Sequence, residues 1–358
     1  MKSEDADVLV TGATGLIGRW LLAELTARGR RVAALVRDAP RREAELRAFV
    51  AAHGGDDDRL VAVSGDVEAP GLGLDGRSDG VRDVYHLAAR VEFGMRVADA
   101  RRTNVDGTLR TLEWALGRPS LRRFVQLGGY RTQRPPEALR EAEYPLAPGA
   151  ARRLYREHGA YEGSKHEAFL AFQRFVGAHE LPWTAVHPSG VIGDSRTGET
   201  TQLMGLGDTI KRLYEGRLPV LVGTRRTFVP VISVDYLASF LASVVERPET
   251  RGQHLTVLDP STPPLLELVG AIAAHLRVDA PRRMLPVGLV RALPAALTGV
   301  EKETLGFLSE DRYDTDSADA HARAVGLVRP DLAQSVGRWC DYLVASRFGA
   351  ASRGQPRA

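Results

Sequence analysis

The feature that most constrains the fold lies at the start of the chain, where three glycines follow a short apolar run. Residues 7–11 predict a buried β-strand, and residues 16–28 have the apolar spacing of an amphipathic helix. Gly12 permits a tight turn between them, Gly15 lets the backbone approach a phosphate group, and Gly18 lets the helix pack on the strand. The pattern predicts a parallel sheet and a phosphate-binding helix N-terminus.

Strand and helix patterns alternate through the first half of the chain. Strands are predicted at 31–36, 60–64, 83–87, 123–127, 183–187 and 254–258, and helices at 41–53, 97–116, 161–178 and 234–245. This order is typical of an α/β doubly wound parallel sheet, the Rossmann fold. We expect a dinucleotide-binding domain over 1–191 to which 231–258 returns. A smaller, discontinuous substrate domain is expected over 192–230 and 259–350.

Composition excludes several classes of protein. Hydrophobic residues make up 44% and charged residues 26%, as in ordinary globular proteins. The basic residues are scattered among 45 acidic ones, so no nucleic-acid surface is predicted. The single cysteine, Cys340, rules out an internal disulfide, and the histidines lack metal-ligand spacing, so we expect no metal site.

No apolar run approaches the ~20 residues of a membrane span. Residues 284–297 come nearest, but Pro286, Arg291 and Pro294 interrupt them. They predict either an apolar wall for a lipophilic substrate or a plain packing helix. The acidic N-terminus enters a strand directly, so the sequence predicts a cytoplasmic protein without a signal peptide.

The end of the second strand bears on the choice between NAD and NADP. An NAD site places a carboxylate there for the ribose 2′-hydroxyl, whereas an NADP site places an arginine for the 2′-phosphate. Val36 occupies that position and Arg37 follows it, while Arg19 lies one residue beyond the last glycine. The sequence therefore favours NADP, in the reduced form NADPH. Asp38 would serve an NAD ribose if the strand ended later.

A tyrosine and a lysine four residues apart open the helix after the fifth strand. This spacing puts the phenol of Tyr161 and the ammonium of Lys165 on one face. An unperturbed phenol has a pKa near 10, and a neighbouring cation lowers it towards the range useful for proton transfer at neutral pH. We therefore predict that Tyr161 is the proton donor and that Lys165 lowers its pKa.

Several motifs together resemble the extended, atypical short-chain dehydrogenases/reductases, and within them the thioester-reductase/male-sterility branch. They are TGATGLIG (11–18), VYHLAA (84–89), NVDGT (104–108), the Tyr161/Lys165 pair, HPSGVIGDSRTG (187–198) and VPV (229–231). The resemblance covers residues 7 to about 260, and the GDSRTG stretch is its most specific part.

The resemblance implies roles for individual residues. The cofactor would be bound by Thr11, Gly12, Thr14, Gly15, Leu16, Ile17, Gly18, Arg19, Arg37, Asp66, Val67, Leu87, Ala88, Ala89, Lys165, Pro188, Ser189 and Val191. Of these, Asp66 and Val67 would contact the adenine, and Pro188 to Val191 the nicotinamide amide. Asn104 would support the catalytic lysine through water, although an ordinary surface asparagine fits the composition equally well.

One departure concerns the end of the fifth strand. Members of the family carry a serine or threonine there, which hydrogen-bonds the substrate carbonyl, but this chain has Gly128 and Gly129. His187 also replaces the arginine usual before the proline. Tyr130, Thr132 or the Gly129 N–H are candidates to replace the missing hydroxyl, so Gly129 is included among the predicted catalytic residues.

The resemblance implies an NADPH-dependent reductase of a carbonyl or acyl-thioester substrate, in which the acyl chain is carried by CoA or a carrier protein. The alternatives are a ketone or aldehyde reductase of the dihydroflavonol/steroid type, a sugar-nucleotide epimerase, or a catalytically weak NADP-binding sensor. The oligomeric state stays open, a homodimer included.

Overall fold

The computed structural model describes residues 5–74, 79–292 and 303–349. The chain divides into two compact units. The first consists of 1–187, 238–256 and 317–325, and the second of 188–237, 257–316 and 326–358. The domain limits expected from the sequence, 1–191 with 231–258 and 192–230 with 259–350, stay a prediction.

A seven-stranded sheet forms the centre of the first unit, in the order β10-β6-β5-β4-β1-β2-β3. The strands are β1 (Val8–Thr11), β2 (Val32–Val36), β3 (Leu60–Ser64), β4 (Asp83–His86), β5 (Arg123–Leu127), β6 (Trp183–Pro188) and β10 (His254–Val257). The pairings from β3 across to β6 are parallel. The strand order reverses between β1 and β4, which is where doubly wound sheets bind ligands. The predicted fold class is confirmed.

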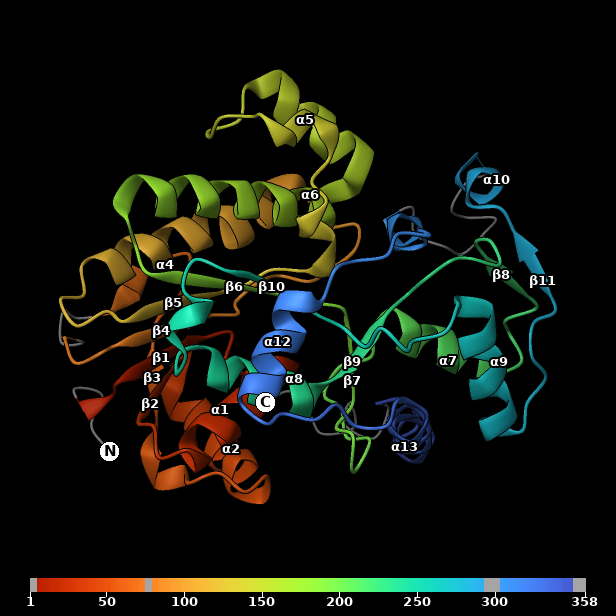
Figure 1. Cartoon of the computed structure of the whole chain (residues 1–358), viewed down its shortest axis with the longest axis horizontal. Helices are drawn as coiled ribbons and strands as arrows, with labels where there is room; N and C mark the ends of the chain where they lie inside the picture. The colour runs from red at the N-terminus through yellow and green to blue at the C-terminus, as the bar shows by residue number, and fades with distance from the viewer. Residues whose placement is uncertain (1–4, 75–78, 293–302, 350–358) are drawn as a thin grey trace. The chain divides into compact units, whose positions relative to one another are not determined.

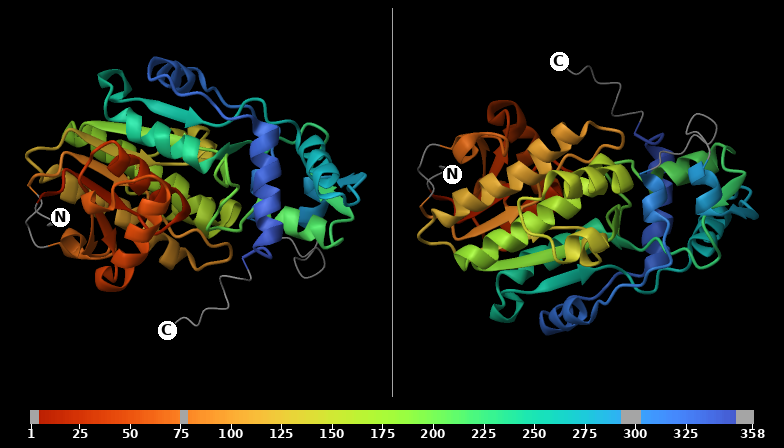
Figure 2. Two further views of the ribbon diagram at one scale, coloured as in Figure 1. Left: turned by 90° about the horizontal axis from the view of Figure 1, so that it is seen from below. Right: turned by 90° about the horizontal axis from the view of Figure 1, so that it is seen from above.

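Helices cover both faces of this sheet. They are α1 (Leu16–Ala27), α2 (Ala39–Ala52), α3 (Val97–Ala100), α4 (Gly107–Leu116), α5 (Glu137–Arg140), α6 (Pro148–His179), α8 (Val234–Val244), which begins in the second unit, and α12 (Asp316–Ala324). A π-helical segment, η4 (Arg101–Asp106), joins α3 to α4, and short 3-10 helices are η2 (Asp57–Arg59), η3 (Pro70–Gly73), η5 (Tyr130–Gln133) and η6 (Pro248–Thr250). In Figures 1 and 2, α4 and α6 lie on one face of the sheet and α1 and α2 on the other.

Complete burial of the strands explains their sequences. Every residue of β1, β2 and β5 is buried, because helices cover both sides of the sheet. Such strands are mainly apolar rather than alternating. The polar exceptions are Thr11 in β1 and Arg123 and Gln126 in β5. Leu9, Val84 and Phe124 meet Leu112 and Phe172 of the covering helices in one core cluster.

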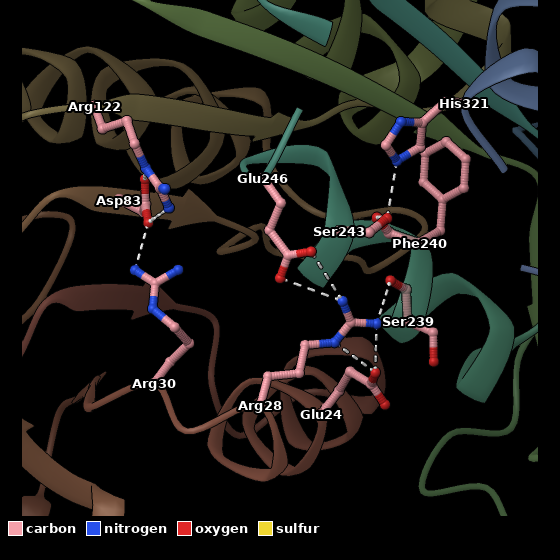
Figure 3. Close-up of polar contacts among 10 residues, drawn as sticks. All are labelled: Glu24, Arg28, Arg30, Asp83, Arg122, Ser239, Phe240, Ser243, Glu246 and His321. Atoms are coloured by element: carbon pink, nitrogen blue, oxygen red, sulfur yellow. Dashed lines mark hydrogen bonds and ion pairs between the residues drawn. The ribbon is translucent and has the colours of Figure 1, made fainter. Parts of the chain in front are cut away.

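Ion pairs surround the amino-terminal end of strand β4 (Figure 3). The Asp83 carboxylate is fully buried and accepts hydrogen bonds from Arg30 Nη2 at 2.6 Å and from Arg122 Nε at 2.9 Å. Arg28, at the end of α1, reaches Glu246 after α8, with Nη1 3.4 Å from Oε1. A buried carboxylate is tolerated only with such partners. The cluster therefore fixes strand β4 to the segments that precede β2 and β5.

The second unit contains two small sheets and several helices. β7 (Gly190–Ile192) pairs in parallel with β9 (Val231–Ser233), and β8 (Val220–Val222) with β11 (Arg283–Leu285). The helices are α7 (Leu206–Tyr214), α9 (Leu265–Leu276), α10 (Val287–Ala292) and α13 (Leu332–Ala345), and the 3-10 helix is η7 (Thr304–Phe307). Their core includes Ile192, Ile210, Ile272 and Trp339.

The GDSRTG loop packs directly against helix α13. Asp194 Oδ1 accepts hydrogen bonds from the backbone N–H groups of Arg196 and Thr197, each at 2.9 Å. Gly198 has a φ of +75°, and a Cβ there would overlap the Arg338 carbonyl of α13. The loop therefore needs its glycine both for the backbone conformation and for the close approach of the helix.

The structure corrects two of the predicted helices. The helix predicted at 161–178 begins at Pro148 and is broken at Gly159, whose φ of 77° and ψ of −177° are not helical. The helix predicted at 97–116 is continuous in position, but residues 101–106 are π-helical. Of the predicted apolar segment 284–297, residues 293–297 lie outside the described residues, and the rest forms the end of β11 and α10.

Candidate active site

The glycine loop is built as the sequence predicts. Gly12 has a φ of +68°, and a Cβ on it would lie 2.7 Å from the backbone nitrogen of Ala88. A Cβ on Gly18 would overlap the Gly12 carbonyl. Helix α1 begins at Leu16, with Gly15 as its N-cap and no side-chain cap. The first N–H groups of α1 are thus left to hydrogen-bond a ligand, so the loop fits a pyrophosphate group.

The residues expected near the ribose 2′ position lie after β2. That strand ends at Val36, so Arg37 is the first residue beyond it and is exposed. Asp38 follows as the N-cap of α2. Arg19 is engaged within the protein, because its Nε donates to the Thr14 carbonyl at 3.0 Å and its guanidinium pairs with Glu45.

The residues expected at the adenine follow β3. Asp66 is partly buried and its carboxylate accepts a hydrogen bond from the Glu68 N–H at 2.9 Å. Val67 is buried and packs towards Gly107 at the start of α4. Ile17 in the first turn of α1 is half-buried.

A chain of hydrogen bonds connects the glycine loop to α4 through His86. The Ala88 N–H donates to Thr11 Oγ1 at 3.2 Å, and Thr11 Oγ1 lies 2.9 Å from His86 Nδ1. On its other side, His86 Nε2 lies 3.0 Å from Thr108 Oγ1, whose hydroxyl donates to the Asn104 carbonyl at 2.7 Å. Burial lowers the pKa of His86 to about 3. The ring is therefore neutral. Because the Thr108 hydroxyl already donates to the Asn104 carbonyl, it accepts from His86, which places the ring proton on Nε2.

A small cleft opens at the carboxyl ends of β4 and β5. It is lined by Ala88, Ala89, Asn104, Thr108, Gln126, Leu127, Gly128, Lys165, Ala168 and Phe169. Leu87 immediately precedes the two alanines. Ala88 also faces Gly12, so the cleft adjoins the phosphate-binding loop. The structure thus brings the predicted cofactor residues of β1, β4 and α6 to one edge of the sheet.

Tyr161 and Lys165 both lie on α6, after the break at Gly159. Lys165 Nζ donates to the Leu127 carbonyl at 3.5 Å, and burial lowers its pKa to about 8, with Glu162 opposing the shift. Burial raises the pKa of Tyr161, with smaller contributions from Glu162 and Tyr130. This is opposite to the direction predicted from the Tyr/Lys spacing, because partial burial of the phenol disfavours its charged form. Tyr161 therefore remains protonated at neutral pH.

Asn104 is a buried structural link and not a surface residue. It lies in the π-helical segment η4 and is 2% exposed. Its Oδ1 accepts from the Arg90 N–H at 2.7 Å, and its Nδ2 donates to Ser164 Oγ at 2.8 Å. Ser164 in turn donates to the Tyr161 carbonyl at 2.8 Å. Asn104 thus fixes the loop after β4 to the turn of α6 that carries Tyr161.

The two glycines after β5 have different surroundings. A Cβ on Gly128 would lie 2.5 Å from His187 Nδ1, whereas a Cβ on Gly129 would meet no atom within 4 Å. The His187 ring is buried and its Nδ1 lies 3.0 Å from Thr132 Oγ1, which donates to the Gly129 carbonyl at 2.8 Å. The imidazole therefore fills the space beside Gly128. The Thr132 hydroxyl already donates to the Gly129 carbonyl. Of the two glycines, Gly129 is the one with open space beside it.

The residues expected at the nicotinamide amide begin where β6 ends. Pro188 is the last residue of β6. Ser189 is buried, its N–H donates to the Val257 carbonyl at 3.0 Å, and its hydroxyl has no hydrogen-bond partner among the described residues. Val191 lies in β7 opposite Ile232.

Sequence reasoning missed several polar residues that line or support the cleft. They are His86, Thr108, Gln126 and Ser164. Gln126 had a visible signal, since an amide between the apolar residues Val125 and Leu127 of a buried strand needs partners. The other three make contacts over 22 to 75 positions in sequence, which no local pattern reveals.

Two further properties bear on what the site can do. In 5–74, 79–292 and 303–349, no cluster of three or more His, Cys, Asp or Glu side chains could hold a metal ion. Over the same ranges, no helix combines the length and apolarity needed to cross a membrane.

Solved structures share this fold. The terminal R domain from the myxalamid PKS-NRPS pathway superposes with a TM-score of 0.75 at 24% identity, covering 96% of this chain and 91% of that one. A thiolation-reductase di-domain from an archaeal non-ribosomal peptide synthetase gives a TM-score of 0.69 at 19% identity, covering 96% and 76%.

The curated relatives differ in length, and one of them is much longer than this chain. The nonribosomal peptide synthetase FrzA of a Cladobotryum species is 28% identical over 296 residues, which is 76% of this chain but only 28% of FrzA. Sterol demethylase protein B of Methylococcus capsulatus is 28% identical over 299 residues, covering 80% of this chain and 79% of that protein.

The family model described as male sterility protein matches residues 10–241. This range contains the glycine loop, the cleft and the Tyr161/Lys165 pair, and it confirms the resemblance inferred from the motifs. The chain belongs to the male sterility protein family.

Proposed function

We propose that this protein is an NADPH-dependent reductase of an acyl thioester. The observation that carries the proposal is the meeting, within one unit, of an uncapped glycine-loop helix, a cleft and a Tyr/Lys pair. Ala88 contacts both the loop and the cleft, and Lys165 lines the same cleft. This arrangement suits a dinucleotide whose reactive ring lies beside Tyr161.

The surroundings of β2 support NADPH over NADH. No carboxylate ends the strand, because its last residue is Val36, and the exposed guanidinium of Arg37 comes next. An arginine fork matches the 2′-phosphate. Asp38 lies two residues after the strand, at the N-cap position of α2, where its side chain makes no capping hydrogen bond.

The chain's own residues divide the work of reduction. When bound, NADPH supplies the hydride that adds to the substrate carbonyl carbon. Tyr161, whose pKa is raised by burial, holds the proton that the carbonyl oxygen takes up. Lys165 binds the ribose hydroxyls, and the Gly129 N–H hydrogen-bonds the carbonyl oxygen. A thioester reduced in this way becomes a hemithioacetal, which releases its thiol and leaves an aldehyde.

The proposed substrate is an acyl chain on CoA or a carrier protein. Similarity to part of a nonribosomal peptide synthetase and to a thiolation-reductase di-domain supports a carrier-bound thioester. The near full-length similarity to a sterol demethylase protein favours a second candidate, the reduction of a ketone or aldehyde on a bulky apolar molecule.

The test is a substrate comparison with purified protein. Acyl-CoA, acyl-pantetheine, aldehyde and steroid-ketone substrates are each incubated with NADPH, and both cofactor oxidation and thiol release are measured. We expect equal amounts of oxidised cofactor and free thiol from the thioesters, and no turnover by Tyr161→Phe, which should still bind NADPH. Turnover of ketones alone would establish the second candidate. Tight NADPH binding without turnover of any substrate would indicate a sensor.

A further inference from the structure

Gln126 is an unusual residue for the centre of this sheet. It is the fourth residue of β5, between Val125 and Leu127, and is only 6% exposed. Its Nε2 donates to the Leu127 carbonyl at 3.3 Å. Its Oε1 is completely buried and has no hydrogen-bond partner among the described residues. A buried acceptor without a donor destabilises the fold, so a functional reason for this amide is expected.

The donor that Gln126 lacks lies in the same cleft. Lys165 and Gln126 both line it, and Lys165 Nζ donates to the Leu127 carbonyl that also accepts from Gln126 Nε2. The two side chains therefore converge on one carbonyl oxygen. An ammonium group has three donors, and within the described part of the chain that of Lys165 makes one hydrogen bond, 3.5 Å long.

We propose that Gln126 is a positioning residue for Lys165. With its amide group turned by 180°, the Gln126 oxygen takes the place of Nε2 beside the Leu127 carbonyl, and the Lys165 ammonium is held between these two oxygens. Its third donor then points out of the cleft. The inference rests on the proposed function only for what the lysine does next, which is to bind the ribose. The amide keeps a charged lysine in a place from which water is largely excluded.

Apart from Glu162, the titratable groups around Lys165 are neutral, so its proposed hydrogen-bond acceptors are the neutral oxygens of Gln126 and Leu127. Glu162 on α6 is the anion that stabilises the ammonium. His86 on β4 and His187 on β6 also face Lys165, but burial lowers the pKa of both rings and keeps them neutral. Tyr161 on α6 is protonated as well, since burial raises its pKa. Removing a carbonyl acceptor should therefore be felt directly in the lysine titration.

The experiment follows the ionisation of Lys165 without any substrate. The chain contains only four lysines, so a protein labelled with ¹³C-lysine gives few ε-carbon signals, and Lys165→Arg assigns the relevant one. We expect Gln126→Leu to lower the pKa of Lys165 by about one unit, a tenfold change, because a hydrogen bond to the charged form is lost. Gln126→Glu should raise it by a similar amount, because an anion replaces the amide.

Thr111→Val is the matched control. It removes a buried hydroxyl from α4, where Thr111 donates to the Gly107 carbonyl at 2.7 Å, and should leave the pKa of Lys165 unchanged. An unchanged lysine pKa in a folded Gln126→Leu protein would overturn the proposal. If that variant does not fold, a Gln126→Glu protein without the upward shift does so. A shifted pKa in a protein that reduces no substrate would sink the proposed function and leave this inference standing.

Discussion

The same methyl group should have opposite consequences at two adjacent glycines. At Gly128 an added Cβ would lie 2.5 Å from His187 Nδ1 and 2.8 Å from its Cε1. At Gly129 it would meet nothing within 4 Å, and the backbone there is extended, with φ −157° and ψ 147°. We therefore expect Gly129→Ala to fold as the parent protein does and Gly128→Ala to be destabilised.

The size of the difference follows from how His187 is held. The ring is 0% exposed, and its nitrogens lie 3.0 Å from Thr132 Oγ1 and 3.3 Å from His254 Nδ1. Overpacking such a site costs about 1–3 kcal/mol, and a broken hydrogen bond adds about 1 kcal/mol. Both substitutions restrict the unfolded chain alike, so that effect cancels. Gly128→Ala should be less stable than Gly129→Ala by about 2 kcal/mol or more.

Urea unfolding measures this difference directly. Trp20, Trp114 and Trp183 belong to the first unit and only Trp339 to the second, so tryptophan fluorescence reports mainly on the unit that contains both glycines. Equal free energies of unfolding for the two variants would refute the assigned position of His187. A Gly129→Ala protein less stable than Gly128→Ala would refute it as well.

Four other results are expected. Gly129→Ser should raise the turnover of a small substrate roughly tenfold, because a hydroxyl added in open space gives the carbonyl oxygen a donor; a loss would mean that substrate fills the space. Arg37→Ala should remove most of the preference for NADPH over NADH in fluorescence titrations, and equal affinities in the parent would contradict the assignment. Asp83→Asn should lower the free energy of unfolding by about 3 kcal/mol, measured in urea, because two arginines lose their carboxylate. Below pH 6.5 stability should fall by up to about 1.4 kcal/mol per pH unit for neutral His86, whose folded pKa is lowered to about 3, and His86→Gln should reduce that slope.

Much of the fold was predictable because its determinants are local. Strands buried on both faces read as uninterrupted apolar runs, as in residues 8–11 and 32–36, and the glycine loop marks the turn that joins strand to helix. The break at Gly159 and the π-helical residues 101–106 were not predictable. Both are local changes of backbone conformation, which side-chain periodicity does not reveal.

The placement of Tyr161 and Lys165 on one helix was predictable from their spacing, and their roles stay a prediction. The direction of the Tyr161 pKa was predicted wrongly, since spacing shows which groups are near but not how far water is excluded. His86 and Gln126 were missed because their partners come from other elements of the fold. The space beside Gly128, filled by His187, could not be foreseen from either residue alone.

The break in α6 separates residues 130–158 from the helical turn that carries Tyr161. Because Gly159 takes up a conformation essentially confined to glycine, the chain before it can change sequence or length without turning the helix that carries Tyr161. Several contacts cross the break. The Tyr155 ring lies where a Cβ on Gly163 would be 2.7 Å away, and its hydroxyl donates to Glu167 at 2.5 Å. Leu154 shares a core cluster with Leu170, and the His158 and His166 rings lie 5.7 Å apart. Grafts of residues 130–158 between relatives should therefore preserve the register of Tyr161 and Lys165 where Gly159 and these contacts are kept.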